Sequence, residues 1–163
     1  MPATTERMAR VDTAWLRMDT EANLMLIVGM WRLSPGITLQ ALRDRIEQRL
    51  LKYRRFRQKV VEDAMGANWV IDPDFDIARH VRAETLKPRR GQSPMQALQA
   101  RIADLATTPL DPAHPLWEMH LVEDFDGGSV LIARIHHCIA DGIALITVML
   151  SLTDGGTLPR LRE

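Results

Sequence analysis

Apolar and polar positions in the first third of the chain follow a strand-like pattern and then a helix-like one. Residues 23–33 (NLMLIVGMWRL) are rich in strand formers and stop at Ser34-Pro35-Gly36, which predicts a buried strand followed by a turn. The next apolar residues recur at helical spacing between charged ones: Leu39, Leu42, Ile46 and Leu50. This pattern predicts an amphipathic helix over 38–52.

Two pairs of strand-like segments are each joined by a short turn sequence. Segments 56–63 and 68–72 flank AMGA and predict a hairpin. Segments 116–125 and 129–139 flank Asp-Gly-Gly, which tolerates the positive φ of a tight turn. The second hairpin therefore carries His136 and His137 at the end of its second strand.

Two more helices have recognisable start signals. Ser93-Pro94-Met95-Gln96 combines a capping box with proline at the first helical position, and Pro109 is expected to end that helix. Further on, Asp141-Gly142 opens an apolar segment over 143–152 that predicts a buried helix, for which Asp141 could serve as the N-cap. Strands alternating with helices and hairpins predict an α+β fold with a mixed or antiparallel sheet packed by helices.

Composition narrows the function classes. The 21 basic and 21 acidic residues cancel, so overall charge does not favour nucleic acid as a partner. Cys138 is the only cysteine, which rules out an intramolecular disulfide and fits a reducing cytoplasmic setting. The N-terminus lacks the apolar core of a signal peptide, and the apolar stretch 24–31 is far shorter than the roughly 20 residues that span a bilayer. We therefore expect a cytoplasmic location, with any membrane contact peripheral.

The two adjacent histidines are the main candidates for chemistry. In an extended strand through residue 137, His137 shares a face with Leu131, Ala133 and Ile135, and His136 points the other way. This divergence argues against a shared metal ion, since ligands must converge. An imidazole among apolar groups stays neutral and can accept a proton, so His137 is the candidate general base. His136 is expected to be an orienting or structural residue.

Cys138 and Asp141 carry competing interpretations. A thiolate nucleophile at Cys138 is disfavoured because strand parity separates its side chain from His137. Asp141 could orient a histidine, but a helix cap or a buried ion-pair partner is the more common role for such a residue.

The segment His136-His137-Cys138-Ile139-Ala140-Asp141-Gly142 matches the HHxxxDG pattern and resembles the CoA-dependent acyltransferases related to chloramphenicol acetyltransferase. The segment Pro115-Leu116-Trp117, together with FDIARHVR and RFRQKV, is similar to the bacterial wax ester synthase and diacylglycerol acyltransferase family. The likeness covers roughly residues 10–155.

This resemblance implies a two-layer, chloramphenicol acetyltransferase-like domain and a reaction. A fatty acyl group passes from acyl-CoA, a co-substrate with no other cofactor or metal, to diacylglycerol or a long-chain alcohol. It also implies roles: His137 as general base, His136 in support, Asp141 as a structural residue, Gly142 as clearance for the substrate channel, and Pro115, Leu116 and Trp117 as a substrate-binding wall. Packing of this last segment in the core is an equal alternative.

The resemblance also implies a division of the chain. Residues 1–155 correspond to the N-terminal acyltransferase half, and 156–163 resemble the start of an interdomain linker. A second half or another subunit would then complete the site, and a membrane or lipid-droplet surface would be a peripheral partner. Two alternatives stay open: a non-catalytic lipid-binding or interaction module of the same fold, and an HHxxxDG acyltransferase with a different acyl donor or acceptor.

Overall fold

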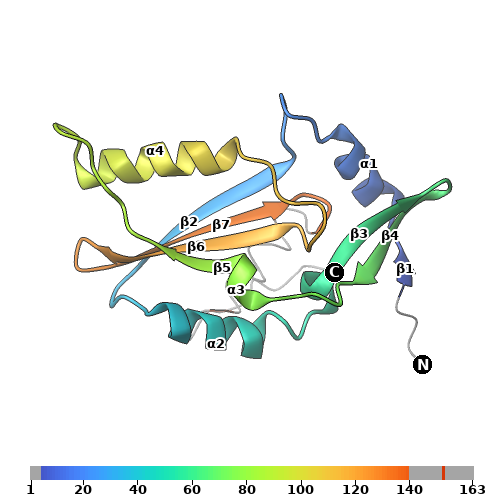
Figure 1. Ribbon diagram of the computed structural model, residues 1–163, viewed down its shortest axis with the longest axis horizontal. Coiled ribbons are helices and arrows are strands. Elements are labelled where there is room, and N and C mark those ends of the chain that lie inside the picture. Colours follow the sequence, from blue (N-terminus) through green and yellow to red (C-terminus); the bar gives the residue numbers. More distant parts are fainter. Residues whose placement is uncertain (1–4, 140–151, 153–163) are drawn as a thin grey trace, which may run out of the picture.

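The computed structural model describes residues 5–139 and residue 152 (Figure 1). Its seven strands are β1 (Thr5–Arg7), β2 (Leu26–Leu33), β3 (Gln58–Asp63), β4 (Gly66–Ile71), β5 (Val81–Glu84), β6 (Trp117–Phe125) and β7 (Gly128–His136). Its helices are α1 (Arg10–Met18), α2 (Leu39–Arg49), the 3-10 turn η1 (Arg54–Arg57), α3 (Ile77–His80) and α4 (Pro94–Ala106). Helix and strand are mixed along the chain, and the predicted α+β class is confirmed.

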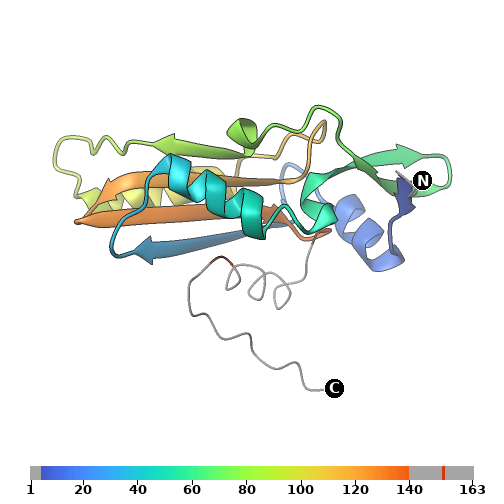
Figure 2. The same cartoon turned by 90° about the horizontal axis from the view of Figure 1, so that it is seen from below.

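The strands form two sheets. The larger has four strands in the order β2-β7-β6-β5, in which only the β5–β6 pair is parallel. The smaller has three antiparallel strands in the order β1-β4-β3. Figures 1 and 2 show the small sheet and α1 beside the end of the large sheet at which β7 finishes.

Helices cover both faces of the four-stranded sheet (Figures 1 and 2). On one face, Leu42 and Ile46 of α2 pack with Leu131 and Ile135 of β7. On the other face, the apolar residues of α4 pack against the opposite side of β6 and β7: Leu98 and Leu105 against Val122, Val130 and Ile132. The large sheet is therefore the middle of three layers, where two layers were expected. Strand parity along β7 up to residue 135 is as predicted.

Local signals placed the strongest elements correctly. Asp126 and Gly127 both have positive φ, 49° and 76°, and close the β6–β7 hairpin as the Asp-Gly sequence predicts. The α4 capping box is complete, because Ser93 Oγ accepts from Gln96 N while Gln96 Oε1 accepts from Ser93 N. The β3–β4 hairpin is also present. Helix α2 begins after the Thr38 cap and ends at Arg49 rather than residue 52, and α4 ends at Ala106, before Pro109.

Five elements were not predicted: β1, α1, η1, α3 and β5. The strand predicted over 129–139 is three residues too long, because the chain turns after His136. The helix expected over 143–152 and the linker expected over 156–163 lie outside the described residues, apart from Leu152, which is buried. In the described part of the chain, no helix is long and apolar enough to cross a bilayer.

Candidate functional site

The histidine pair lies at the junction between β7 and a tight turn. The amide of His136 donates to the carbonyl of Leu116, at 3.0 Å, on the β6 side. The amide of His137 donates to the carbonyl of Met25, at 2.9 Å, just before β2. Ile139 N then closes the turn on His136 O at 3.0 Å. The backbone of both histidines is thus fixed by the neighbouring strands.

His136 is a buried ring with a defined orientation. Its Nδ1 accepts a hydrogen bond from Cys138 N at 3.0 Å, so in the neutral ring the proton is on Nε2. Nε2 faces Asp19 Oδ2 at 3.6 Å. Burial lowers the pKa of His136, and the Asp19 carboxylate only partly opposes this effect. These contacts fit a residue that supports the turn.

His137 has different surroundings. Its half-buried ring stacks on the indole of Trp15, with centroids 4.7 Å apart and planes inclined by 21°. Because β7 ends at His136, strand parity does not extend to His137, contrary to the prediction. The apolar neighbour that the structure gives this ring is an aromatic side chain from α1. No described residue hydrogen-bonds its ring nitrogens.

Helix α1 therefore supplies two contacts that sequence reasoning missed. Trp15 covers the ring of His137, and Asp19, the residue that follows the helix, faces His136. Asp19 Oδ1 also accepts from Met25 N at 2.6 Å, and Met25 O in turn accepts from His137 N. The spacing of Val11, Trp15 and Met18 is a helical signal that was available in the sequence.

The segment Pro115-Leu116-Trp117 is buried and divided between two environments. Leu116 binds the backbone of His136 and packs with Cys138. Trp117 lies in the core under α2, where its Nε1 donates to Phe56 O at 2.9 Å and its ring stacks on His80 at 4.7 Å. His80 Nδ1 lies 2.7 Å from Trp117 O, and burial lowers the pKa of His80. The structure thus brings Leu116 to the histidines and Trp117 to the core.

Three further residues were considered for the site: Asp141, Gly142 and Cys138. Asp141 and Gly142 lie outside the described residues, so their roles stay predictions. Burial raises the pKa of Cys138 to about 12, which leaves its thiol protonated near neutral pH and agrees with the argument against a thiolate nucleophile. Within residues 5–139 and 152, no group of three or more His, Cys, Asp or Glu side chains could hold a metal ion.

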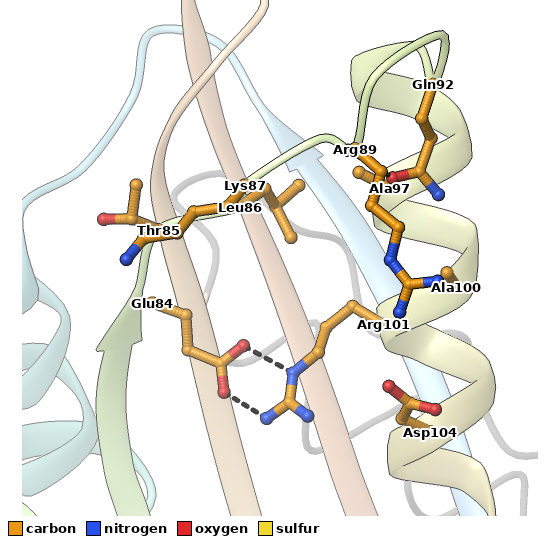
Figure 3. A pocket seen from close by; sticks show the side chains of 10 residues that line it. All are labelled: Glu84, Thr85, Leu86, Lys87, Arg89, Gln92, Ala97, Ala100, Arg101 and Asp104. Carbon is orange, nitrogen blue, oxygen red and sulfur yellow. Dashed lines mark hydrogen bonds and ion pairs between the residues drawn. The ribbon is translucent and has the colours of Figure 1, made fainter.

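A cavity of about 520 Å³ lies away from the histidines, between β5 and α4 (Figure 3). Half of its ten lining residues are charged, and a two-point ion pair crosses it: Arg101 Nε and Nη2 donate to Glu84 Oε2 and Oε1 at 2.8 and 2.5 Å. This arrangement satisfies both partners and ties α4 to β5.

Solved structures share this architecture. A mutant of the starter condensation domain of rhizomide synthetase RzmA, in complex with C8-CoA, superposes with a TM-score of 0.74 at 17% identity, over 91% of this chain and 34% of that one. The wax ester synthase/diacylglycerol acyltransferase from Marinobacter aquaeolei VT8 gives a TM-score of 0.69 at 22% identity, over 86% and 35%. The chain therefore has the chloramphenicol acetyltransferase-like fold of these two structures.

Sequence relatives narrow this class. The model of the wax ester synthase/diacylglycerol acyltransferase catalytic domain matches residues 8–162, and the chain belongs to this family. A probable diacylglycerol O-acyltransferase of Mycobacterium tuberculosis, tgs3, is 34% identical over an alignment of 149 residues that covers 87% of this chain and 54% of the relative. Another from the same organism, tgs1, is 34% identical over 88% of this chain and 32% of the relative. The chain thus spans about half or less of the length of these relatives.

Proposed function

We propose that the chain is the histidine-bearing part of an acyltransferase that moves a fatty acyl group from acyl-CoA to diacylglycerol or a long-chain alcohol. The observation that carries the proposal is the turn after β7, which fixes His137 by its backbone and leaves its ring nitrogens without hydrogen bonds to described residues. Family membership supports the same reaction.

In this mechanism His137 acts as the general base. It removes the proton of the acceptor hydroxyl while the oxygen attacks the thioester carbonyl, and it returns the proton to the departing CoA thiolate. His136 and Asp19 position the turn, and Trp15 holds the ring plane of His137. Asp141 would stabilise the motif loop, and Gly142 would leave room for the substrate channel.

This chain spans only part of the length of its relatives, which supports a second requirement for activity. A partner half, supplied by a further segment or another subunit, would supply the rest of the active site around His137. Leu116 would shape the wall beside the histidines, while Pro115 and Trp117 would act through the packing that holds it.

The test is acyl transfer from palmitoyl-CoA to hexadecanol or a diacylglycerol, followed by CoA release and by product formation. It is run with the chain alone and with the part of tgs1 that this chain does not match added. We expect His137→Ala to lower the rate by roughly 10²- to 10⁴-fold, the usual contribution of a general base. His114→Ala, a histidine held by Asp72 at 3.0 Å, is the matched control and should leave the rate unchanged. Full transfer by His137→Ala, or no transfer in either setting, would contradict the proposal.

A further inference from the structure

The cavity in Figure 3 lies at the end of the large sheet that is away from the histidine turn (Figure 1). Strand β5 ends at Glu84 beside Val122 of β6, whereas the turn binds Leu116 at the other end of β6. The walls are the loop that follows β5 and one side of α4, where the small side chains of Ala97 and Ala100 leave the cavity of about 520 Å³ open. A cavity of this size can hold a small ligand, and the proposed mechanism does not use it.

The stretch of chain that borders this cavity is purely basic. Residues 85–103 (TLKPRRGQSPMQALQARIA) contain four basic residues and no acidic one, although the two kinds balance in the chain as a whole. Three of the four lie in the loop of residues 85–93, the basic loop: Lys87, Arg89 and Arg90. Within the described part of the chain, the side chains of these three make no hydrogen bond or ion pair. The basic loop therefore carries positive charge that no described residue compensates.

The acidic residues near the cavity already have cationic partners. Arg101 is held by Glu84 through Nε and Nη2, and Asp104 on the same helix attracts the same guanidinium. Further into the sheet, Glu118 is paired with Arg134 at 2.7 Å. Since these carboxylates are engaged at the other end of the cavity, the charge of the basic loop is left for a ligand.

Arg89 is the residue of the basic loop whose side chain follows the cavity. Figure 3 shows it running beside α4, past Ala97 and toward Ala100 and Arg101. Its backbone is held by a tight turn, because Arg89 N donates to Gln92 Oε1 and Gln92 N donates to Arg89 O, both at 2.9 Å. The Nε2 of Gln92 and the Nη1 of Arg101 make no hydrogen bond with a described residue. The wall therefore offers one uncompensated guanidinium and two further donors.

We propose that this cavity binds a phosphate group beside the basic loop, with Arg89 as the principal cation and Gln92 Nε2 and Arg101 Nη1 as further donors. A guanidinium can donate two parallel hydrogen bonds to a phosphate, which makes arginine well suited to this ligand. The headgroup of an anionic lipid and a soluble phosphate ester share this chemistry. The inference goes beyond the proposed function, since it does not involve His137.

The first test uses inorganic phosphate and glycerol 3-phosphate, with binding followed by the backbone amide NMR signals of the chain. Saturable shifts are expected at Arg89 and Gln92. Arg89→Gln should weaken binding about tenfold or more, the usual contribution of a hydrogen bond to a charged group. Arg90→Gln is the matched control, because it removes the same charge from the adjacent exposed residue, which does not line the cavity. It should change the affinity less than about twofold, since solvent and salt screen a charge outside the site.

A second pair of variants tests the cavity without changing its charge. Ala100→Leu fills the space beside Arg89 and should weaken phosphate binding severalfold. Ala103→Leu is exposed on the same helix but does not line the cavity, and it should leave the affinity unchanged. Equal effects of these two substitutions would contradict binding in this cavity.

The lipid arm measures flotation of the chain with vesicles of phosphatidylcholine, alone or mixed with an equal share of phosphatidic acid. Binding to the mixed vesicles that requires Arg89 but not Arg90 would support the site and identify a lipid headgroup as the source. Binding of glycerol 3-phosphate alone, with the same dependence on Arg89, would support it with a soluble ester as the source.

Two results would overturn the inference. Equal losses in Arg89→Gln and Arg90→Gln would mean that the basic loop attracts anions only through its net charge, and no binding in either arm would mean that the cavity is not a phosphate site. His137→Ala should bind phosphate as the parent chain does, so this test does not depend on the outcome for acyl transfer.

Discussion

The two faces of the four-stranded sheet are packed by different means. Beneath α2, Leu42 and Ile46 contact the apolar side chains of β6 and β7, and a cavity of about 470 Å³ beside α2 is also mainly apolar. Beneath α4, an apolar cluster is joined by a partly buried network of charges from four elements: Glu84, Arg101, Glu118, His120 and Arg134.

The charged network fixes α4 at defined points. Arg134 donates from Nη1 to the carbonyls of Leu105 and Thr108 at the end of α4, and from Nη2 to Glu118 at 2.7 Å. His120 lies between Glu118 at 3.1 Å and Glu84 at 2.8 Å. Apolar packing tolerates a shift of position better than such directional contacts do, so α2 is expected to be held less rigidly on the sheet than α4.

The largest expected effect comes from removing the centre of the network. Arg134→Met leaves Glu118 buried with fewer partners and frees two carbonyls at the end of α4. We expect a loss of roughly 3 to 5 kcal/mol in the free energy of unfolding, measured by urea denaturation. Ile46→Val on the other face should cost only about 1 kcal/mol. Similar losses in both variants would remove the contrast between the faces.

The second-largest expected effect is a loss of folding stability at low pH, caused by the α4 face. Burial by itself raises the pKa of Glu118, but the contacts with His120 and Arg134 and the charge of Arg82 outweigh it and lower the pKa from 4.5 to about 2. A lowered carboxylate pKa contributes stability that is present above pH 4.5 and is lost as the pH falls toward 2, here about 3 kcal/mol.

Glu118→Gln removes this titration. Urea unfolding at pH 6, 4.5 and 3 should show a smaller loss of stability with acid in Glu118→Gln than in the parent chain. Parallel pH profiles for the two proteins would show that Glu118 is not a source of the acid sensitivity.

The smallest expected difference in stability between the two faces comes from the N-terminal caps of α2 and α4. Ser93 and Gln96 form a reciprocal cap on α4, whereas α2 has only the bond from Ala41 N to Thr38 Oγ1, at 3.2 Å. Ser93→Ala and Thr38→Ala should each cost about 1 kcal/mol, with Ser93→Ala the more costly because it breaks the reciprocal pair. Thermal unfolding of the two variants measures this order, and a larger effect at Thr38 would contradict it.

Sequence signals predicted the parts of the fold that local chemistry determines. The positive φ at Asp126 and Gly127 and the capping box at Ser93 depend only on neighbouring residues. Strand β5 could not be found in this way, because its four residues are stabilised by parallel pairing with β6, which is distant in sequence. The end of β7 was misplaced because the ring of His136 captures the amide of Cys138, a contact that strand patterns do not contain.

The candidate site was likewise predictable from the sequence only in part. The motif placed both histidines at the end of a strand, and their separate roles as support and base stay predictions. The contacts of Trp15 with His137 and of Asp19 with His136 depend on how α1 packs beside the end of β7. They could be recognised only in the three-dimensional structure.

Strand β7 is bordered on both sides, by β2 and by β6, while α1 contains no fully buried residue. In hydrogen-exchange terms, the amides of β7 should open only with the whole domain, and those of α1 should open by local fluctuations. The ring of His137 is therefore expected to lie between a slowly exchanging strand and a rapidly exchanging helix, and its rotation should follow local fluctuations of α1 rather than those of the sheet.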